Sequence, residues 1–154
     1  MKKGLLLMAL VACGLTACDN FHTSDNGSLD GYWQMTHVDT LATGNSADMT
    51  SRMIFWAVQS ELIELSDRHD AVEDGARYPS IFYHFERSAE KLILLGDPKP
   101  RLGNRINSDS EVASHDQCEY YGLNDRGDTL RILQLGAKKM TLESETLRMY
   151  FRKF

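Results

Sequence analysis

The feature that most constrains this fold is a series of short segments rich in β-branched and aromatic residues, separated by polar turns. Eight such segments follow one another after residue 28. Segments of this kind, bounded by Gly, Asp, Ser and Asn, are typical of β-strands. They span residues 29–38, 52–58, 62–65, 78–87, 91–95, 129–135, 140–144 and 147–154.

The connections between these strands indicate how they pair. One short helix is expected within residues 110–121, with Ser110 as its N-cap and Gly122 after its end. The stretch 96–110 has no pattern and is expected to be a loop. No segment resembles a crossover helix between parallel strands, so the strands are expected to be antiparallel. We therefore predict an all-β fold, an up-and-down antiparallel β-barrel of about eight strands with one short helix, because closure removes exposed edges.

Two points of this fold stay open. Segment 62–65 either returns along segment 52–58 as a hairpin or continues it through a bend at Gln59-Ser60. Segment 52–58 is apolar at successive positions, so its inward and outward faces are not assigned.

The last segment alternates more clearly than the others. Leu147, Met149 and Phe151 share one face, whereas Arg148 and Arg152 lie on the other.

Residues 1–17 have the order of a signal peptide. Lys2 and Lys3 precede an apolar run at 5–12, which is too short to reach the roughly 20 residues that a transmembrane helix needs. The run ends at Leu15-Thr16-Ala17-Cys18, which resembles the bacterial lipobox. In that motif the cysteine becomes the first residue of the mature protein and carries the lipid.

The chain is therefore predicted to have three parts. Residues 1–17 form a lipoprotein signal peptide, residues 18–28 form a lipidated cysteine and a flexible tether, and residues 29–154 form the barrel domain. The membrane is then a partner through the lipid on Cys18.

Charge and cysteine content exclude some classes of protein. The chain has a formal net charge of −5, which becomes −7 without Lys2 and Lys3. Binding to nucleic acid or to an anionic lipid surface needs a basic excess, so the net charge argues against both kinds of partner. Cys118 is the one thiol left once Cys13 is removed with the signal and Cys18 is lipidated, so an internal disulfide is excluded.

The first predicted strand carries a family signature. Gly31-Tyr32-Trp33 matches the Gly-x-Trp signature of lipocalins, and with the lipobox the chain resembles the small lipocalin-like (calycin) lipoproteins of the Bacteroidota cell envelope. The resemblance implies that Trp33 closes one end of the barrel and that Arg152 or Arg148 covers its ring. Such a cation–π contact contributes about 0.5–2 kcal/mol. It also implies a lipid-anchored location at the outer membrane, on the periplasmic or the surface face.

The interior of the barrel decides between two functions. An eight-stranded barrel is at the size where side chains fill the interior or leave room for one small ligand. Seven aromatic residues could line a pocket for a small hydrophobic ligand: Phe55, Trp56, Phe82, Tyr83, Phe85, Tyr150 and Phe151. The same residues could instead fill the barrel, which would then act as a packed interaction or structural module. We expect a monomer in either case.

Catalytic motifs and cofactor motifs are absent from the sequence, and we expect no enzyme and no cofactor. One exception is considered: His115 lies three residues before Cys118, so on a helix it could lower the pKa of the thiol. No two of the five histidines stand at i,i+2 or i,i+4, and no metal site is predicted.

Two further features could bind or be modified. Lys99, Arg101 and Arg105 form a basic cluster that could contact a ligand carboxylate or a lipid phosphate. Thr40 and Thr129 lie in Asp-Thr-Leu triplets that resemble the O-glycosylation sites of exported Bacteroidota proteins.

Overall fold

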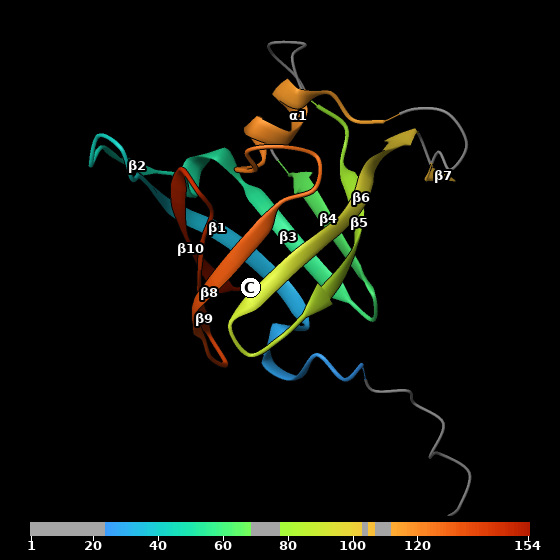
Figure 1. Ribbon diagram of the computed structural model, residues 1–154, viewed down its shortest axis with the longest axis horizontal. Coiled ribbons are helices and arrows are strands. Elements are labelled where there is room, and N and C mark those ends of the chain that lie inside the picture. The colour runs from blue at the N-terminus through green and yellow to red at the C-terminus, as the bar shows by residue number, and fades with distance from the viewer. Residues whose placement is uncertain (1–23, 69–77, 103–104, 107–111) are drawn as a thin grey trace, which may run out of the picture.

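Eight antiparallel strands close into a barrel (Figure 1). The computed structural model describes residues 24–68, 78–102, 105–106 and 112–154. Each barrel strand pairs with the next along the chain, and the last returns to the first, as predicted for an up-and-down barrel. The strands are β1 (Gly31–Thr40), β3 (Ile54–Gln59), β4 (Leu62–Asp67), β5 (Ile81–Arg87), β6 (Lys91–Leu102), β8 (Thr129–Leu135), β9 (Lys139–Glu143) and β10 (Leu147–Lys153).

Among the described residues, five short elements lie outside this ring. They are the 3-10 helices η1 (Gly27–Leu29) and η2 (Thr50–Arg52), strands β2 (Ser46–Asp48) and β7 (Arg105–Ile106), and helix α1 (His115–Tyr120). β2 pairs with β1, and β7 pairs with β6. Within the ranges given above, no helix is long and apolar enough to cross a membrane.

The predicted loop at 96–110 is partly strand, because β6 continues through Pro98 and Pro100. β6 pairs with β8 only up to Ile93, and between Leu94 and Pro100 that edge of β6 has no strand partner among the described residues. Proline is tolerated at such an edge because no N–H donor is required there. The Pro98 carbonyl accepts a hydrogen bond from the amide of Ala113 at 3.0 Å.

The structure also answers the two questions that the sequence left open, namely how segment 62–65 follows segment 52–58 and which face of segment 52–58 points inward. β3 and β4 form a hairpin, with Gln59 opposite Leu62. In β3, Trp56 belongs to the core cluster, as do its neighbours on the same face, whereas Phe55 lies on the outer face. Phe55 is nevertheless buried, because the rings of Tyr32 and Phe154 pack against it with centroids 5.0 and 5.3 Å away. Both faces of β3 are therefore apolar.

Trp33 seals one end of the barrel. Its ring is fully buried, and its Nε1 donates a hydrogen bond to the carbonyl of Leu29 at 2.7 Å. The Lys153 Nζ lies 4.9 Å from the ring centroid and donates to the Ser28 carbonyl at 3.1 Å. We call this the closed end.

The cation on Trp33 is thus Lys153 and not one of the two arginines that the resemblance implied. Trp33 points inward, and Lys153 continues the inward face of β10. Arg148 and Arg152 lie on the opposite face of β10: Arg148 pairs with Glu143 at 2.7 Å, and the Arg152 Nε donates to Gln34 at 2.8 Å.

The segment in front of β1 lies against the closed end. The Asn26 Nδ2 donates to the carbonyl of Ser60 at 2.6 Å and to the Asp30 carboxylate at 2.8 Å, and Arg87 donates to the Asn26 carbonyl. Residues 24–28, predicted to belong to the tether, are therefore held by the barrel. Cys18 and the signal peptide lie outside the described residues.

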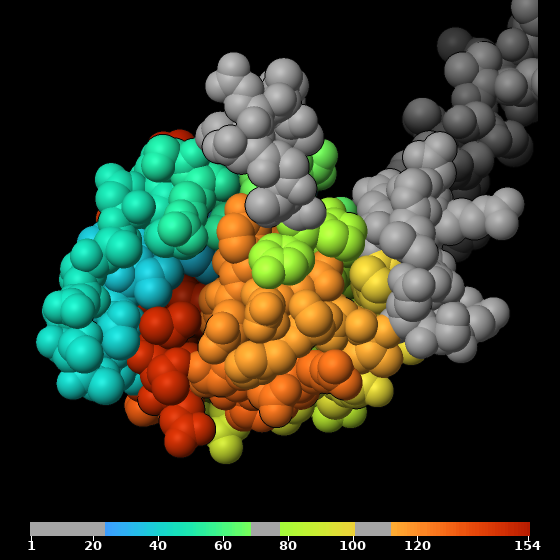
Figure 2. Space-filling model, turned by 90° about the horizontal axis from the view of Figure 1, so that it is seen from above, coloured from blue at the N-terminus to red at the C-terminus, as the bar shows by residue number. Residues whose placement is uncertain are grey.

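Helix α1 covers the other end of the barrel, which we call the open end (Figures 1 and 2). The Ser114 hydroxyl is its N-cap and accepts a hydrogen bond from the amide of Gln117 at 3.2 Å. The predicted cap, Ser110, lies outside the described residues. Gly122 follows the helix at φ +90°, as predicted for a C-terminal glycine, and an added Cβ there would lie 2.7 Å from the Met149 Sδ.

Gly31→Ala is expected to lower the free energy of unfolding by about 1–3 kcal/mol, because Gly31 has a backbone conformation that other residues rarely adopt. Its φ is +120°, and an added Cβ would lie 2.7 Å from the Cε of Lys153. Urea unfolding of the purified variants measures the change. Gly136→Ala is the control, since a Cβ there would meet its nearest atom at 3.8 Å. Equal stability of the two variants would contradict this role of Gly31.

Candidate functional site

A pocket of about 300 Å³ opens beside α1 at the open end of the barrel. Figure 2, which views this end from above, shows α1 and the chain after it over the middle of the barrel, with β2 and η2 to one side. Five separate elements contribute to the pocket. Its lining residues are Met35, Val38, Ala47, Asp48, Met49, Arg52, Glu119, Tyr120, Gly122 and Leu147.

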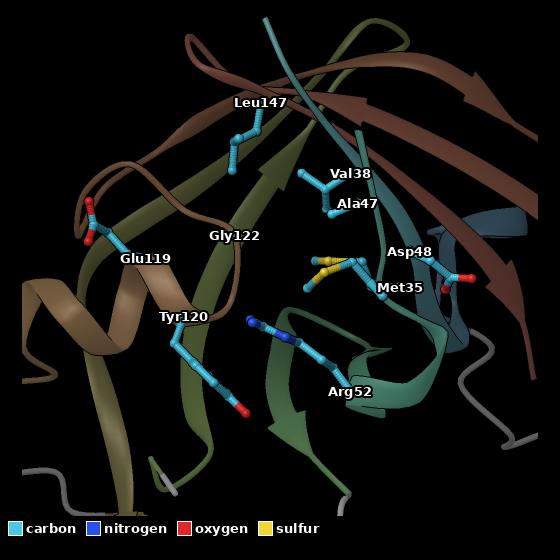
Figure 3. A pocket seen from close by; sticks show the side chains of 10 residues that line it. Met35, Val38, Ala47, Asp48, Arg52, Glu119, Tyr120, Gly122 and Leu147 are labelled. Atoms are coloured by element: carbon cyan, nitrogen blue, oxygen red, sulfur yellow. The ribbon is translucent and has the colours of Figure 1, made fainter. Parts of the chain in front are cut away.

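One part of the pocket is apolar. Met35 and Val38 come from β1, and Leu147 comes from the start of β10 (Figure 3). Met35 is fully buried and belongs to the core cluster, so the deep side of the pocket is continuous with the barrel core. Such a surface favours the apolar body of a ligand.

Arg52 provides the positive charge of the pocket. Figure 3 shows its side chain reaching from η2 into the pocket, while the carboxylates of Asp48 and Glu119 point away. Both acids are engaged elsewhere: Asp48 accepts from the Thr50 amide at 2.7 Å, and Glu119 lies 3.3 Å from His115. Within the part of the chain that the structure describes, Arg52 forms no ion pair. Its guanidinium is therefore available to an acidic group.

Tyr120 forms a wall of the pocket and is held from two sides. Its hydroxyl donates to the Asp67 carboxylate at 2.5 Å. Its ring contacts Tyr78 and Tyr121, with centroids 5.4 and 5.2 Å away. Because Asp67 is the last residue of β4, this contact ties α1 to the barrel rim.

Comparison with known proteins identifies the family. The lipocalin-like domain family matches residues 12–154. The chain belongs to that family. This confirms the resemblance carried by Gly31 and Trp33, and no curated protein matches the chain.

Two solved structures are similar to this lipocalin-like chain. A lipocalin-like protein from Bacteroides uniformis is 21% identical, with a TM-score of 0.59 over 83% of this chain and 100% of its own. An uncharacterized protein from Bacteroides eggerthii is 16% identical, with a TM-score of 0.55 over 81% of this chain and 98% of its own. At these identities the likeness shows the fold alone.

The seven aromatic residues predicted to line a pocket divide between the two faces of the lipocalin-like barrel. Trp56, Tyr83, Phe85 and Phe151 are buried in the core cluster. The other three, Phe55, Phe82 and Tyr150, do not belong to it. The hydroxyl of Tyr150 donates to the Asp39 carboxylate at 2.8 Å, in keeping with its place on the face of β10 that carries the arginines. None of the seven lines the open-end pocket.

Other predicted site residues lie away from this pocket. Lys99 and Arg101 belong to β6 and Arg105 to β7, and the β6–β7 pairing places Arg101 opposite Ile106. Anion binding at this cluster stays a prediction. Thr40 ends β1 and Thr129 begins β8, and glycosylation of either also stays a prediction.

Cys118 lacks the environment of a reactive thiol. It is fully buried, and its Sγ lies 3.5 Å from the Tyr83 hydroxyl. Burial raises the pKa of the Cys118 thiol, which favours the protonated form. His115 is exposed and interacts with Glu119 instead. Among the described residues, no group of three His, Cys, Asp or Glu side chains could hold a metal ion.

Iodoacetamide is expected to alkylate Cys118 at least about 100-fold more slowly in the folded protein than in guanidinium, because the thiol is buried and protonated. Mass spectrometry over time measures the rate. Ala137→Cys is the control, since Ala137 is exposed and its cysteine should react rapidly in the folded protein. Rapid alkylation of native Cys118 at neutral pH would restore the thiol as a candidate nucleophile.

Proposed function

We propose that this protein is a lipid-anchored lipoprotein of the cell envelope whose barrel binds a small ligand in the open-end pocket. The ligand has an apolar body and an acidic group. The observation that carries the proposal is the position of Arg52, an arginine without an ion-pair partner among the described residues, pointing into a pocket with an apolar floor.

The apolar surface and the guanidinium of the pocket are complementary to the apolar body and the acidic group of such a ligand. Met35, Val38 and Leu147 offer an apolar surface, and removing a ligand's apolar surface from water is favourable by roughly 25 cal/mol per Å². The guanidinium of Arg52 presents donors in a planar fork that matches a carboxylate or sulfonate. Neither Asp48 nor Glu119 competes, because both carboxylates point away from the pocket.

A second function is favoured by the packing of the barrel interior. Trp33, Trp56 and Tyr83 are among the largest fully buried side chains and occupy space that a ligand would need. A barrel filled in this way would present its loops to a protein partner of the envelope. The two functions predict different results for the pocket variants below.

Arg52→Gln is expected to weaken binding of 8-anilinonaphthalene-1-sulfonate about 10- to 100-fold, because it removes a charged hydrogen-bond donor. Binding of N-phenyl-1-naphthylamine, the same body without the sulfonate, should be unchanged. Ala47→Trp fills the pocket from β2 and should abolish binding of both. Fluorescence titration measures the dissociation constants.

Arg126→Gln is the matched control, since Arg126 is an exposed arginine outside the pocket. Probe affinities that do not respond to Ala47→Trp would contradict the assigned site. Absence of binding by either probe would favour the protein-interaction function.

Cys18→Ser in the full-length chain is expected to abolish incorporation of a palmitate analogue and to release the protein from the membrane fraction. Cys13→Ser is the control, because Cys13 lies within the predicted signal peptide and should leave lipidation intact. Metabolic labelling and membrane fractionation give the result. Continued labelling of the Cys18→Ser protein would refute the anchor.

A further inference from the structure

We propose that the closed end of the barrel docks on anionic headgroups of the bilayer that holds the lipid anchor. The contact is a docking patch of four exposed residues on β9, β10 and their neighbouring turns: Lys138, Lys139, Arg152 and Phe154. This inference rests on the lipidation of Cys18 in the proposed function.

The pairing of the strands concentrates positive charge in the patch. Lys139 lies directly opposite Arg152 in the β9–β10 ladder, and the Lys153 amide donates to the Lys138 carbonyl at 2.9 Å. Like charges directly opposite each other on neighbouring strands repel. The register therefore brings together three cations in a chain whose formal net charge is −5.

These cations differ from the other basic residues on the same wall of the barrel. Arg131 and Arg148 share the carboxylate of Glu143 at 3.0 and 2.7 Å. In contrast, Arg152 donates to the neutral amide of Gln34. No carboxylate among the described residues forms an ion pair with Lys138, Lys139 or Arg152. The patch is thus the part of this wall whose charge is not neutralised.

An exposed aromatic ring stands beside these charges. Phe154 is 74% exposed, although its amide donates to the Tyr32 carbonyl at 2.8 Å and its ring packs perpendicular to that of Phe55 with the centroids 5.3 Å apart. Aromatic side chains flanked by lysine and arginine are favoured at the interface of a bilayer with water. A neutral protein surface would offer no negative charge to pair with the three cations, whereas anionic headgroups would.

The position of the anchor selects the bilayer as the occupant. Ser24 lies at the closed end, where its hydroxyl donates to Asp30, and Cys18 precedes it by six residues. Six residues span at most about 22 Å, so the lipid and the patch are held at the same end of the molecule. The segment with η1 runs beneath the barrel in Figure 1, whereas α1 lies at the opposite end.

Docking in this orientation fixes the direction of the pocket. The open-end pocket then faces away from the bilayer that carries the anchor. Its ligand is exchanged with the aqueous phase or with another envelope component, and not with the anchoring leaflet.

The test uses the full-length lipidated protein reconstituted in phosphatidylcholine vesicles, with and without phosphatidylglycerol, that contain a nitroxide-headgroup lipid. A fluorophore is attached at Ala137→Cys in the β8–β9 turn or at Asn45→Cys in the β1–β2 turn, both exposed. Cys118 is buried, so we expect it to stay unlabelled under native conditions. Quenching of the Ala137 probe should increase severalfold with phosphatidylglycerol, and quenching of the Asn45 probe should stay low.

Lys138→Glu/Lys139→Glu should abolish the increase at Ala137. Lys99→Glu/Arg126→Glu makes the same change of net charge toward the open end, outside the patch, and should preserve the increase at Ala137. Raising the salt concentration to about 1 M should also suppress the increase in quenching of the Ala137 probe, since the Debye length falls to about 3 Å.

Equal quenching of the Ala137 probe in both vesicles, or equal effects of the two double variants, would overturn the docking and leave the proposed function intact. The mass of the N-terminal peptide from the same sample shows whether Cys18 carries lipid. An unmodified peptide would overturn the anchor and the docking together.

Discussion

The contact between Lys153 and Trp33 is the interaction on which the rest of this barrel depends. Lys153 lies opposite Trp33 in the β1–β10 ladder, which is the pairing that closes the ring. The Lys153 Nζ reaches the Trp33 ring and the Ser28 carbonyl, and Trp33 donates to Leu29. One cation thus joins the first strand, the last strand and the segment beneath them. Gly31 has no side chain where the Lys153 methylenes pass.

Sealing the closed end leaves the open end as the place where a ligand can enter. Buried rings occupy the barrel above Trp33, and the Tyr83 hydroxyl meets Cys118 of α1. α1 therefore rests on a filled interior, and the space that remains lies at its side, between Tyr120 and η2. The pocket thus lies between α1 on one side and β2 and η2 on the other.

Much of this architecture could be predicted from the sequence, because period-two patterns and turns are local signals. The β8 strand coincides with its predicted range, and Gly122 ends the helix as expected. The alternation of β10 also contained the information that identifies Lys153, since that residue shares the face of Met149 and Phe151. The expectation of an arginine followed the family signature and overlooked this periodicity.

The candidate site was beyond the reach of such patterns. Arg52 was predicted to begin the strand at 52–58, but that strand begins at Ile54 and Arg52 ends η2, and no pattern in the sequence places its charge at a pocket. Phe55 failed as a pocket residue for a related reason: its burial depends on Tyr32 and Phe154, which are distant in the sequence. Whether such a residue lines a pocket or is buried elsewhere depends on contacts between segments that are distant in the sequence.

Whether a charged side chain can bind a partner depends on whether an ion pair within the protein already neutralises it. The chain as a whole is acidic, and that balance alone argued against an anionic surface as partner. Yet Glu143 neutralises Arg131 and Arg148, while Asp48 and Glu119 turn away from Arg52. The cations that remain unpaired among the described residues include Arg52 at the open end and Lys139 near the closed end. Because interactions between exposed charges decay within about 10 Å at moderate salt, each end presents its own local charge to a partner, independent of the net value.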